Sequence, residues 1–253
     1  MYTLATTQQL RARLDLETNA ADDERLWRAL TAATARIERD SGRRFTPRLA
    51  ALPHRARHPR ELILLDDLLQ LQRLANGDGR DIDRRNVQTL PAASGGSVGV
   101  LRLTGSQRFS GPDAVQVTGL WGWHERWSQA WRRSVDRLQR PPLAATATAL
   151  QVADSGRFHA GQLLRIGDEY LRLLSIDAAS HTLNVERGAQ GTTAATHNRG
   201  SAIDVYRPPA TVTLLCLRLA AWLYREPDRE PAGDLPADVA DELRALRRHS
   251  AAS

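Results

Sequence analysis

The stretch QLLRIGDEYLRLLSI, residues 162–176, decides how the middle of the chain folds. Two short apolar runs, 162–166 and 170–176, stand on either side of Gly167. Short apolar runs bounded by glycine are typical of strands, because glycine adopts the backbone angles that a tight turn requires. The stretch therefore predicts two successive strands.

Three further runs of the same kind surround these two, at 149–152, 182–185 and 202–206. Five short strands within about sixty residues predict a compact β-barrel or sandwich. The pair Pro141–Pro142 marks the start of this region. We therefore expect an inserted all-β, barrel-like domain over 143–206.

Helical patterns occur on both sides of this region. Thr6 and Gln9 have the spacing of a capping box, and apolar residues at three- and four-residue spacing predict a longer helix that ends near Gly42. After two prolines at 208 and 209, residues 212–223 are apolar on nearly every face, which predicts a buried helix.

Between residues 61 and 117 the apolar period shortens, and the turn residues Asn76–Gly79 predict a hairpin. The expected fold class is therefore α+β. It consists of a helical bundle with an antiparallel β-hairpin or small sheet over 1–142 and 207–253, plus the inserted β-barrel-like domain.

Composition limits the chemistry. Among 253 residues, 42% are apolar and 25% charged, which is typical of a globular protein. The chain contains no lysine, and this excludes a lysine nucleophile, a Schiff base and a phosphate-binding loop lysine. One cysteine excludes an internal disulfide and a cysteine-rich zinc site. With no signal-like or membrane-length apolar run, the default expectation is a disulfide-free, soluble protein of a reducing cytoplasm.

The formal charge of +6 equals the local arginine excess of segment 36–60. Arginine pairs with phosphate and carboxylate through two parallel hydrogen bonds, so this segment is a candidate for contact with DNA or with an acidic partner. The alternative is a solvated, arginine-rich connector. The candidate residues are Arg43, Arg44, Arg48, Arg55 and Arg57.

Two apolar stripes are candidate contact surfaces. Trp123, Trp127 and Trp131 recur every four residues, which would place them on one helical face; this favours a packing seam or a subunit interface over base stacking. The second stripe follows a proline-rich, charged linker over 228–236. It lies on a C-terminal helix that either docks on a partner or folds back on its own bundle. Its residues are Val239, Leu243 and Leu246, followed by Arg247 and Arg248.

No fragment of the sequence forms a convincing active site. His54 and His58 have metal-ligand spacing, but Pro53 and Pro59 enclose them and no carboxylate lies between. Cys216 lies in the buried helix, where a thiol is inert. The turn 188–193 resembles a phosphate cradle without its lysine, and the adjacent acids at 66–67 and 168–169 point to opposite faces of a strand. We expect no enzyme, no cofactor and no metal.

Several stretches, taken in chain order, resemble the head–tail connector (adaptor or head-completion) proteins of tailed bacteriophages. They are ADDERLW (21–27) with IERDSGRRF (37–45), LLDDLL (64–69) with NGDG (76–79) and VQVTGLWG (115–122), and RPPA (207–210) with CLRLAAWLYR (216–225). A further stretch, ERGAQGTTAATH (186–197), resembles a small β-module common in phage virion proteins. The minimal members of the connector family lack a domain like that expected over 143–206.

The resemblance implies a structural virion protein of the neck, present in the host cytoplasm during assembly. Family members form a ring of about twelve copies below the portal, extend the DNA channel and attach the next neck or tail component. The implied partners are the chain itself, the portal, a downstream stopper or tail-completion protein and, without specificity, genomic double-stranded DNA, with no membrane. The implied portal-docking residues are those of the C-terminal stripe, 239–248. Interface candidates are the three tryptophans of the stripe together with Leu26, Trp27 and Leu30. The alternatives are another neck, tail or baseplate protein, or a nucleic-acid-binding protein that uses the basic segment.

Overall fold

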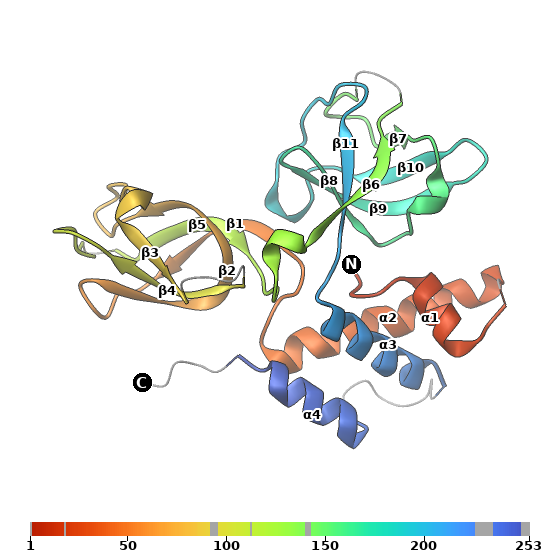
Figure 1. Ribbon diagram of the computed structural model, residues 1–253, viewed down its shortest axis with the longest axis horizontal. Helices are drawn as coiled ribbons and strands as arrows, with labels where there is room; N and C mark the ends of the chain where they lie inside the picture. Colours follow the sequence, from red (N-terminus) through yellow and green to blue (C-terminus); the bar gives the residue numbers. More distant parts are fainter. Residues whose placement is uncertain are drawn as a thin grey trace. The chain divides into compact units, whose positions relative to one another are not determined.

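The computed structural model describes residues 2–17, 19–91, 96–111, 113–139, 143–225 and 235–248. The α-helices are α1 (Thr7–Leu14), α2 (Ala20–Ser41), α3 (Ala210–Arg225) and α4 (Ala237–Leu246) (Figure 1). The strands are β1 (Arg48–His54), β2 (Glu61–Ala75), β3 (Val87–Leu90), β4 (Val98–Leu103), β5 (Val115–Trp121), β6 (Trp131–Arg137), β7 (Ala149–Gln151), β8 (Leu163–Ile166), β9 (Glu169–Asp177), β10 (Thr182–Glu186) and β11 (Ala202–Tyr206). The predicted boundary at 141–142 and most of the predicted linker 228–236 lie outside the described residues.

The expected fold class is wrong. The described chain is mostly β, with eleven strands in two antiparallel sheets beside four helices, and is not a helical bundle with a small hairpin. The prediction missed the length of β2. Its 15 residues pair with β4 through the first half of the strand and with β5 through the second. Irregularities in the register of β2 interrupt its in–out alternation, so the sequence pattern shows only short apolar runs there.

The chain folds into two compact units. Unit 1 comprises 1–42 and 129–247, and unit 2 comprises 43–128 and 248–253. The expected inserted domain, 143–206, lies within unit 1 together with the four helices. Unit 1 is therefore assembled from both ends of the chain.

Unit 2 contains a five-stranded sheet in the order β1-β5-β2-β4-β3. Its core is formed by apolar side chains from all these strands and by Trp121, whose indole Nε1 donates a hydrogen bond to the Ala50 carbonyl at 2.9 Å. His54 stacks on the Trp121 ring, with 5.4 Å between the ring centroids. Unit 2 thus has a hydrophobic core of its own.

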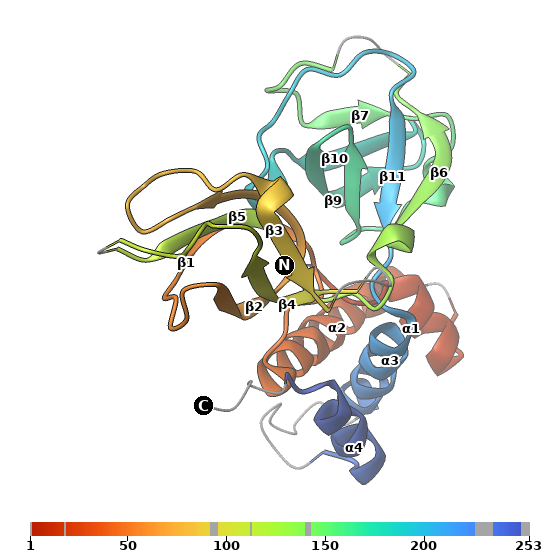
Figure 2. The same cartoon turned by 60° about the vertical axis from the view of Figure 1, so that its left-hand side comes forward.

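In unit 1, α2 and α3 pack against each other, and α1 and α4 pack against both of them (Figures 1 and 2). The predicted capping box is confirmed: the Gln9 backbone N–H donates to Thr6 Oγ1, and the Thr6 backbone N–H donates to Gln9 Oε1. Gly42 follows α2 with a φ of 65°, the left-handed conformation that commonly terminates a helix. The buried character predicted for α3 is confirmed for seven of its residues, whereas Leu214 is 50% exposed.

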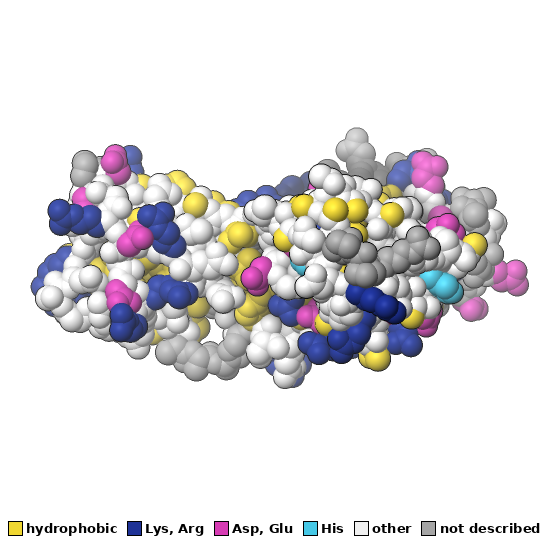
Figure 3. Space-filling model, turned by 90° about the horizontal axis from the view of Figure 1, so that it is seen from above, with side chains coloured by type: hydrophobic (Ala, Val, Ile, Leu, Met, Phe, Trp, Pro, Cys, Tyr) yellow, Lys and Arg dark blue, Asp and Glu magenta, His cyan; other side chains and the backbone are white. Residues whose placement is uncertain are grey.

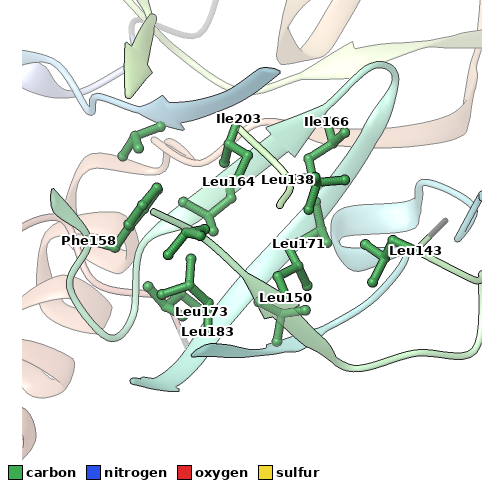
Figure 4. Close-up of a cluster of buried hydrophobic side chains, with 13 residues drawn as sticks. Leu138, Leu143, Leu150, Phe158, Leu164, Ile166, Leu171, Leu173, Leu183 and Ile203 are labelled. Carbon is green, nitrogen blue, oxygen red and sulfur yellow. The ribbon is translucent and has the colours of Figure 1, made fainter. Parts of the chain in front are cut away.

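The second sheet of unit 1 has the order β6-β11-β8-β9-β10-β7. It includes all five strands predicted between 149 and 206, and β6 joins it from before the expected boundary. Its core contains ten leucine, isoleucine and phenylalanine side chains that point toward one another (Figure 4). Hydrogen bonds join the free edges of β6 and β7. The backbone N–H of Gln139 donates to the backbone carbonyl of Gln151, and the Asp136 carboxylate accepts from the backbone N–H groups of Ala153 and Asp154. The sheet therefore closes into a barrel.

Candidate functional site

The most highly organised polar site lies in the barrel of unit 1, around the Glu169 side chain. This side chain has no exposed surface, and Arg187 binds both of its oxygens, with Nε 2.7 Å from Oε1 and Nη2 2.8 Å from Oε2. The amides of Gly188 and Ala195 donate to the two oxygens at 2.9 and 3.0 Å, and His197 Nε2 lies 2.7 Å from Oε2. One buried carboxylate thus organises the whole stretch 186–197.

The backbone of this stretch explains its residue types. Gly188 has a φ of 59° and begins a tight turn in which Gln190 is also left-handed. Thr192 Oγ1 accepts a hydrogen bond from the Tyr170 amide at 2.9 Å, which connects the turn to β9. Arg187 donates further hydrogen bonds to three carbonyls, those of residues 144, 147 and 195. The stretch therefore ties the barrel together from several directions.

This site is not suited to acid–base chemistry. Burial alone would raise the pKa of Glu169, but the hydrogen bonds from Arg187, Ala195, Gly188 and His197 outweigh burial and lower that pKa to about 2. A general base works best with a pKa near the operating pH, and its lone pairs must be able to reach a substrate. Five donors already engage the two oxygens of Glu169. We therefore interpret the cluster as a structural one that stabilises the barrel.

The predicted basic segment enters unit 2, where its residues separate into two groups. Arg43 lies within the fold: its Nη1 contacts Asp67 Oδ1 at 3.0 Å, and its guanidinium lies over the Trp123 ring, 5.2 Å from the centroid. Burial lowers the pKa of Arg43, opposed by the charge of Asp67. Arg48 is half-buried on β1, and Arg44 is exposed. Arg43 is thus a structural residue of unit 2, paired within its own chain.

The second group lies at one end of unit 2. Arg55 and Arg57 are exposed on the loop between β1 and β2, and so is Arg60, which the sequence reasoning did not select. Within the described ranges, none of these three forms an ion pair with a carboxylate. Arg108, exposed on the β4–β5 loop, also has no such pair among the described residues. Arg60 is the last arginine of the basic segment 36–60, so the sequence already contained this signal, but placing Arg108 beside it requires the fold.

Three loops meet at this end. The Phe109 amide donates to the Pro59 carbonyl at 2.7 Å, which joins the β4–β5 loop to the β1–β2 loop. Asn76, at the end of β2, donates to the Arg108 carbonyl at 3.0 Å and accepts from the Ser110 amide at 2.9 Å. A Cβ atom on Gly77 would lie 2.3 Å from the Asp113 carbonyl oxygen, so only glycine permits this approach. Arg60 and Arg108 therefore lie on loops that hydrogen bonds connect to each other.

The formal charge is distributed unevenly between the two units. Unit 2 contains the whole formal excess of +6, whereas the arginines and acids of unit 1 balance. Arginine side chains are visible over unit 2, at the left of the space-filling view, with acidic side chains among them (Figure 3). The excess predicted for one segment therefore belongs to one folded unit.

The predicted tryptophan stripe is wrong, because the residues do not lie on a helix. Gly122, with a φ of 145°, follows β5, and the chain then passes through a 3-10 turn at Trp127–Gln129 into β6. Trp123 packs edge-on against Phe45, with ring centroids 5.7 Å apart. Trp131 belongs to unit 1 and contacts the rings of Tyr170 and Tyr206 at 5.0 and 5.4 Å. A recurrence of four residues can arise across a turn as well as along a helix.

The interface candidates on α2 also need correction. Leu26 and Leu30 have no exposed surface and form part of the core of the helical layer, so they cannot contact a second copy in this conformation. Trp27 is half-buried, and its ring lies so close to Gly161 that a Cβ atom there would be 2.6 Å from it. These apolar residues hold α2 to α3 and to the barrel.

The C-terminal helix folds back on its own bundle, which was one of the two predicted alternatives. Val239 and Leu243 are each 3% exposed against the neighbouring helices, which corrects their assignment as docking residues. Leu246 is half-buried, and Arg247 Nε donates to the Asp40 carbonyl at 3.2 Å. Arg248 belongs to unit 2 and donates from Nη2 to the carbonyls of residues 64 and 66.

The remaining candidate ligands and nucleophiles stay apart. His54 is buried, whereas His58 is exposed on the β1–β2 loop. Cys216 is fully buried, and burial raises the pKa of its thiol to about 12. Among the described residues no three His, Cys, Asp or Glu side chains converge as metal ligands would. No helix in the described ranges has both the length and the apolar character needed to cross a membrane.

Comparisons with protein-family models, with curated proteins and with solved structures found no match to this chain.

Proposed function

We propose that this protein is a structural component of a phage-type virion, an adaptor that forms a ring below the portal and extends the DNA channel. The observation that carries the proposal is the packing of α2 on α3. Helices from the two ends of the chain form one layer, and the β segments lie between them in the sequence. That order is the one implied by the resemblance in residues 21–45 and 207–225.

A ring requires two different complementary surfaces on each copy. The structure offers one apolar candidate on the outer face of unit 2, where Ile63 pairs with Val100 and Val100 pairs with Leu90 across three strands. Ile63 is 50% exposed and Leu65, two residues along β2, is 77% exposed. Val100 and Leu90 are half-buried. Exposed apolar residues that lie together on one face mark protein contacts more often than scattered single residues do. We propose that a neighbouring copy covers this row.

The test combines the chain with its cognate portal. Light scattering after size exclusion, with negative-stain images, should show several copies joined to the portal as a ring. The double variant Ile63→Ser/Leu65→Ser should weaken the association between copies. Leu174→Ser is the matched control, because Leu174 is 49% exposed on β9 of unit 1. A chain that does not associate with the portal under any condition would refute the adaptor proposal.

A second candidate is another neck, tail or baseplate protein that contacts the portal indirectly or not at all. The sheet of unit 2 and the barrel of unit 1 favour it, as does the resemblance of 186–197 to a module of virion proteins. Association with a tail-tube or baseplate component in place of the portal would select this candidate.

A further inference from the structure

We infer that the loop end of unit 2 binds the phosphate backbone of duplex DNA. We define this surface by Arg55, Arg57 and Arg60 on the β1–β2 loop and Arg108 on the β4–β5 loop. The choice of duplex DNA over other polyanions rests on the proposed function. The test uses the isolated chain, so its outcome is read separately from ring formation.

These four arginines form no ion pair within the described fold. Elsewhere in the chain, exposed arginines commonly pair with a nearby acid, as Arg102 does with Glu61 at 2.8 Å and Arg157 with Asp154 at 3.0 Å. The four loop arginines are exposed, and none pairs with a carboxylate within the part of the chain that the structure describes. Their charge is therefore open to an external anion.

Hydrogen bonds connect the loops that carry this surface. The Leu103 amide donates to the Arg60 carbonyl at 2.8 Å, and the Phe109 amide to the carbonyl of the preceding Pro59. Asn76 then connects Arg108 to the turn after β2. Side chains that project from a connected framework lose less conformational freedom on binding than those on separate loops.

The residues around these arginines indicate which kind of anion they bind. A protein partner is held by apolar or aromatic anchors at the centre of the contact, and single-stranded nucleic acid by aromatic stacking. Among the described residues of these loops no large apolar side chain is exposed: Phe109 is 7% exposed, and the exposed apolar residues of unit 2, Ile63 and Leu65, lie on β2. Arginines without such anchors match the charge pattern of a duplex backbone, which carries no demand for base contacts.

The experiment measures binding of the full chain to a labelled DNA duplex by fluorescence anisotropy over a series of salt concentrations. Each neutralised phosphate contributes about −0.9 to the slope of log K against log salt, so four contacts give about −3.6. The variant Arg55→Ser/Arg57→Ser/Arg60→Ser should reduce the slope to about −0.9. Two duplexes of unrelated sequence should bind equally.

The matched control is Arg13→Ser/Arg132→Ser/Arg199→Ser, which removes three exposed arginines from the neutral unit 1. It changes the net charge by the same amount and should keep the wild-type slope. Unchanged circular dichroism and melting temperatures for both variants show that folding is intact.

Three results would overturn the inference. Equal losses in the two triple variants would mean that net charge, and not this surface, attracts DNA. Tighter binding of a single strand than of the duplex would assign the surface to base stacking. Failure to bind the duplex, with arginine-dependent binding of a poly-glutamate peptide, would assign it to an acidic protein partner.

Discussion

Replacing Glu169 with glutamine should destabilise the barrel of unit 1 more than the same replacement at an exposed glutamate would destabilise the protein. The amide group of glutamine would turn two N–H donors toward a site where every neighbour is already a donor. Arg187, whose side chain is only 5% exposed, would keep its charge without a partner. A buried charge that loses its counter-ion is a strongly destabilising defect.

The size of the effect follows from the pKa. Folding lowers the pKa of Glu169 from 4.5 to about 2, against the effect of burial, because its five hydrogen bonds favour the ionised form. This lowering of the pKa corresponds to about 3 kcal/mol of stability at neutral pH. Breaking a buried ion pair by removing one partner typically costs about 3–5 kcal/mol. Both routes give a loss of about 3 kcal/mol, which lowers the melting temperature by roughly 6–12 °C.

The measurement is thermal and urea unfolding of the wild type and Glu169→Gln, beside the control Glu61→Gln. Glu61 contacts Arg102 Nε at 2.8 Å, nearly the distance between Glu169 and Arg187, but both partners are substantially exposed. An exposed pair contributes less than about 1 kcal/mol, so the control should change little.

The pH dependence adds a second criterion. Because folding lowers the pKa of Glu169, its stabilisation is complete above about pH 4.5 and is lost as the pH falls toward 2. The gap between the wild type and Glu169→Gln should therefore close in acid. Similar losses in both glutamine variants at pH 7, or a gap that stays constant down to pH 2, would refute the reasoning.

Three further replacements test other parts of the structure. Gly161→Ala should lower the free energy of unfolding by about 2 kcal/mol more than Gly200→Ala does. Both glycines have positive φ angles, but only at Gly161 would the new Cβ meet the Trp27 ring. Equal melting temperatures would contradict the packing of α2 on the barrel. His54 has its pKa lowered by burial, so the stability contributed by its neutral form should fall as the pH drops below about 6.5, and His54→Phe should flatten that dependence in urea unfolding. Val135 has a φ of 69° and is 77% exposed, so Val135→Gly should raise the free energy of unfolding by about 0.5–1 kcal/mol. A lower melting temperature would show that the backbone at Val135 is not strained.

Local patterns predicted the elements whose signals are local. The capping box at Thr6 and Gln9, the helix end at Gly42 and the buried helix α3 all follow from residue types within a few positions of each other. The five strands between 149 and 206 were predicted for the same reason, since glycines delimit each short apolar run. These features depend on backbone preference and on the period of apolar residues.

The candidate sites were predictable only in part. The stretch 186–197 was recognisable, but nothing in the sequence joined Glu169 to Arg187 and His197. The tryptophan recurrence predicted a helix because a period of four does not distinguish a helix from a turn between two strands.

The sequence by itself determined the arginine-only charge, most of the helices and strands, and the position of the basic segment. Only the tertiary structure decided that β2 pairs with two partners, that Asp136 and Gln139 close the barrel, and that four loop arginines from two separate segments share one end of unit 2. The physical reason is that strand pairing and burial join residues far apart in the chain, and the choice among such pairings depends on the packing of the whole unit.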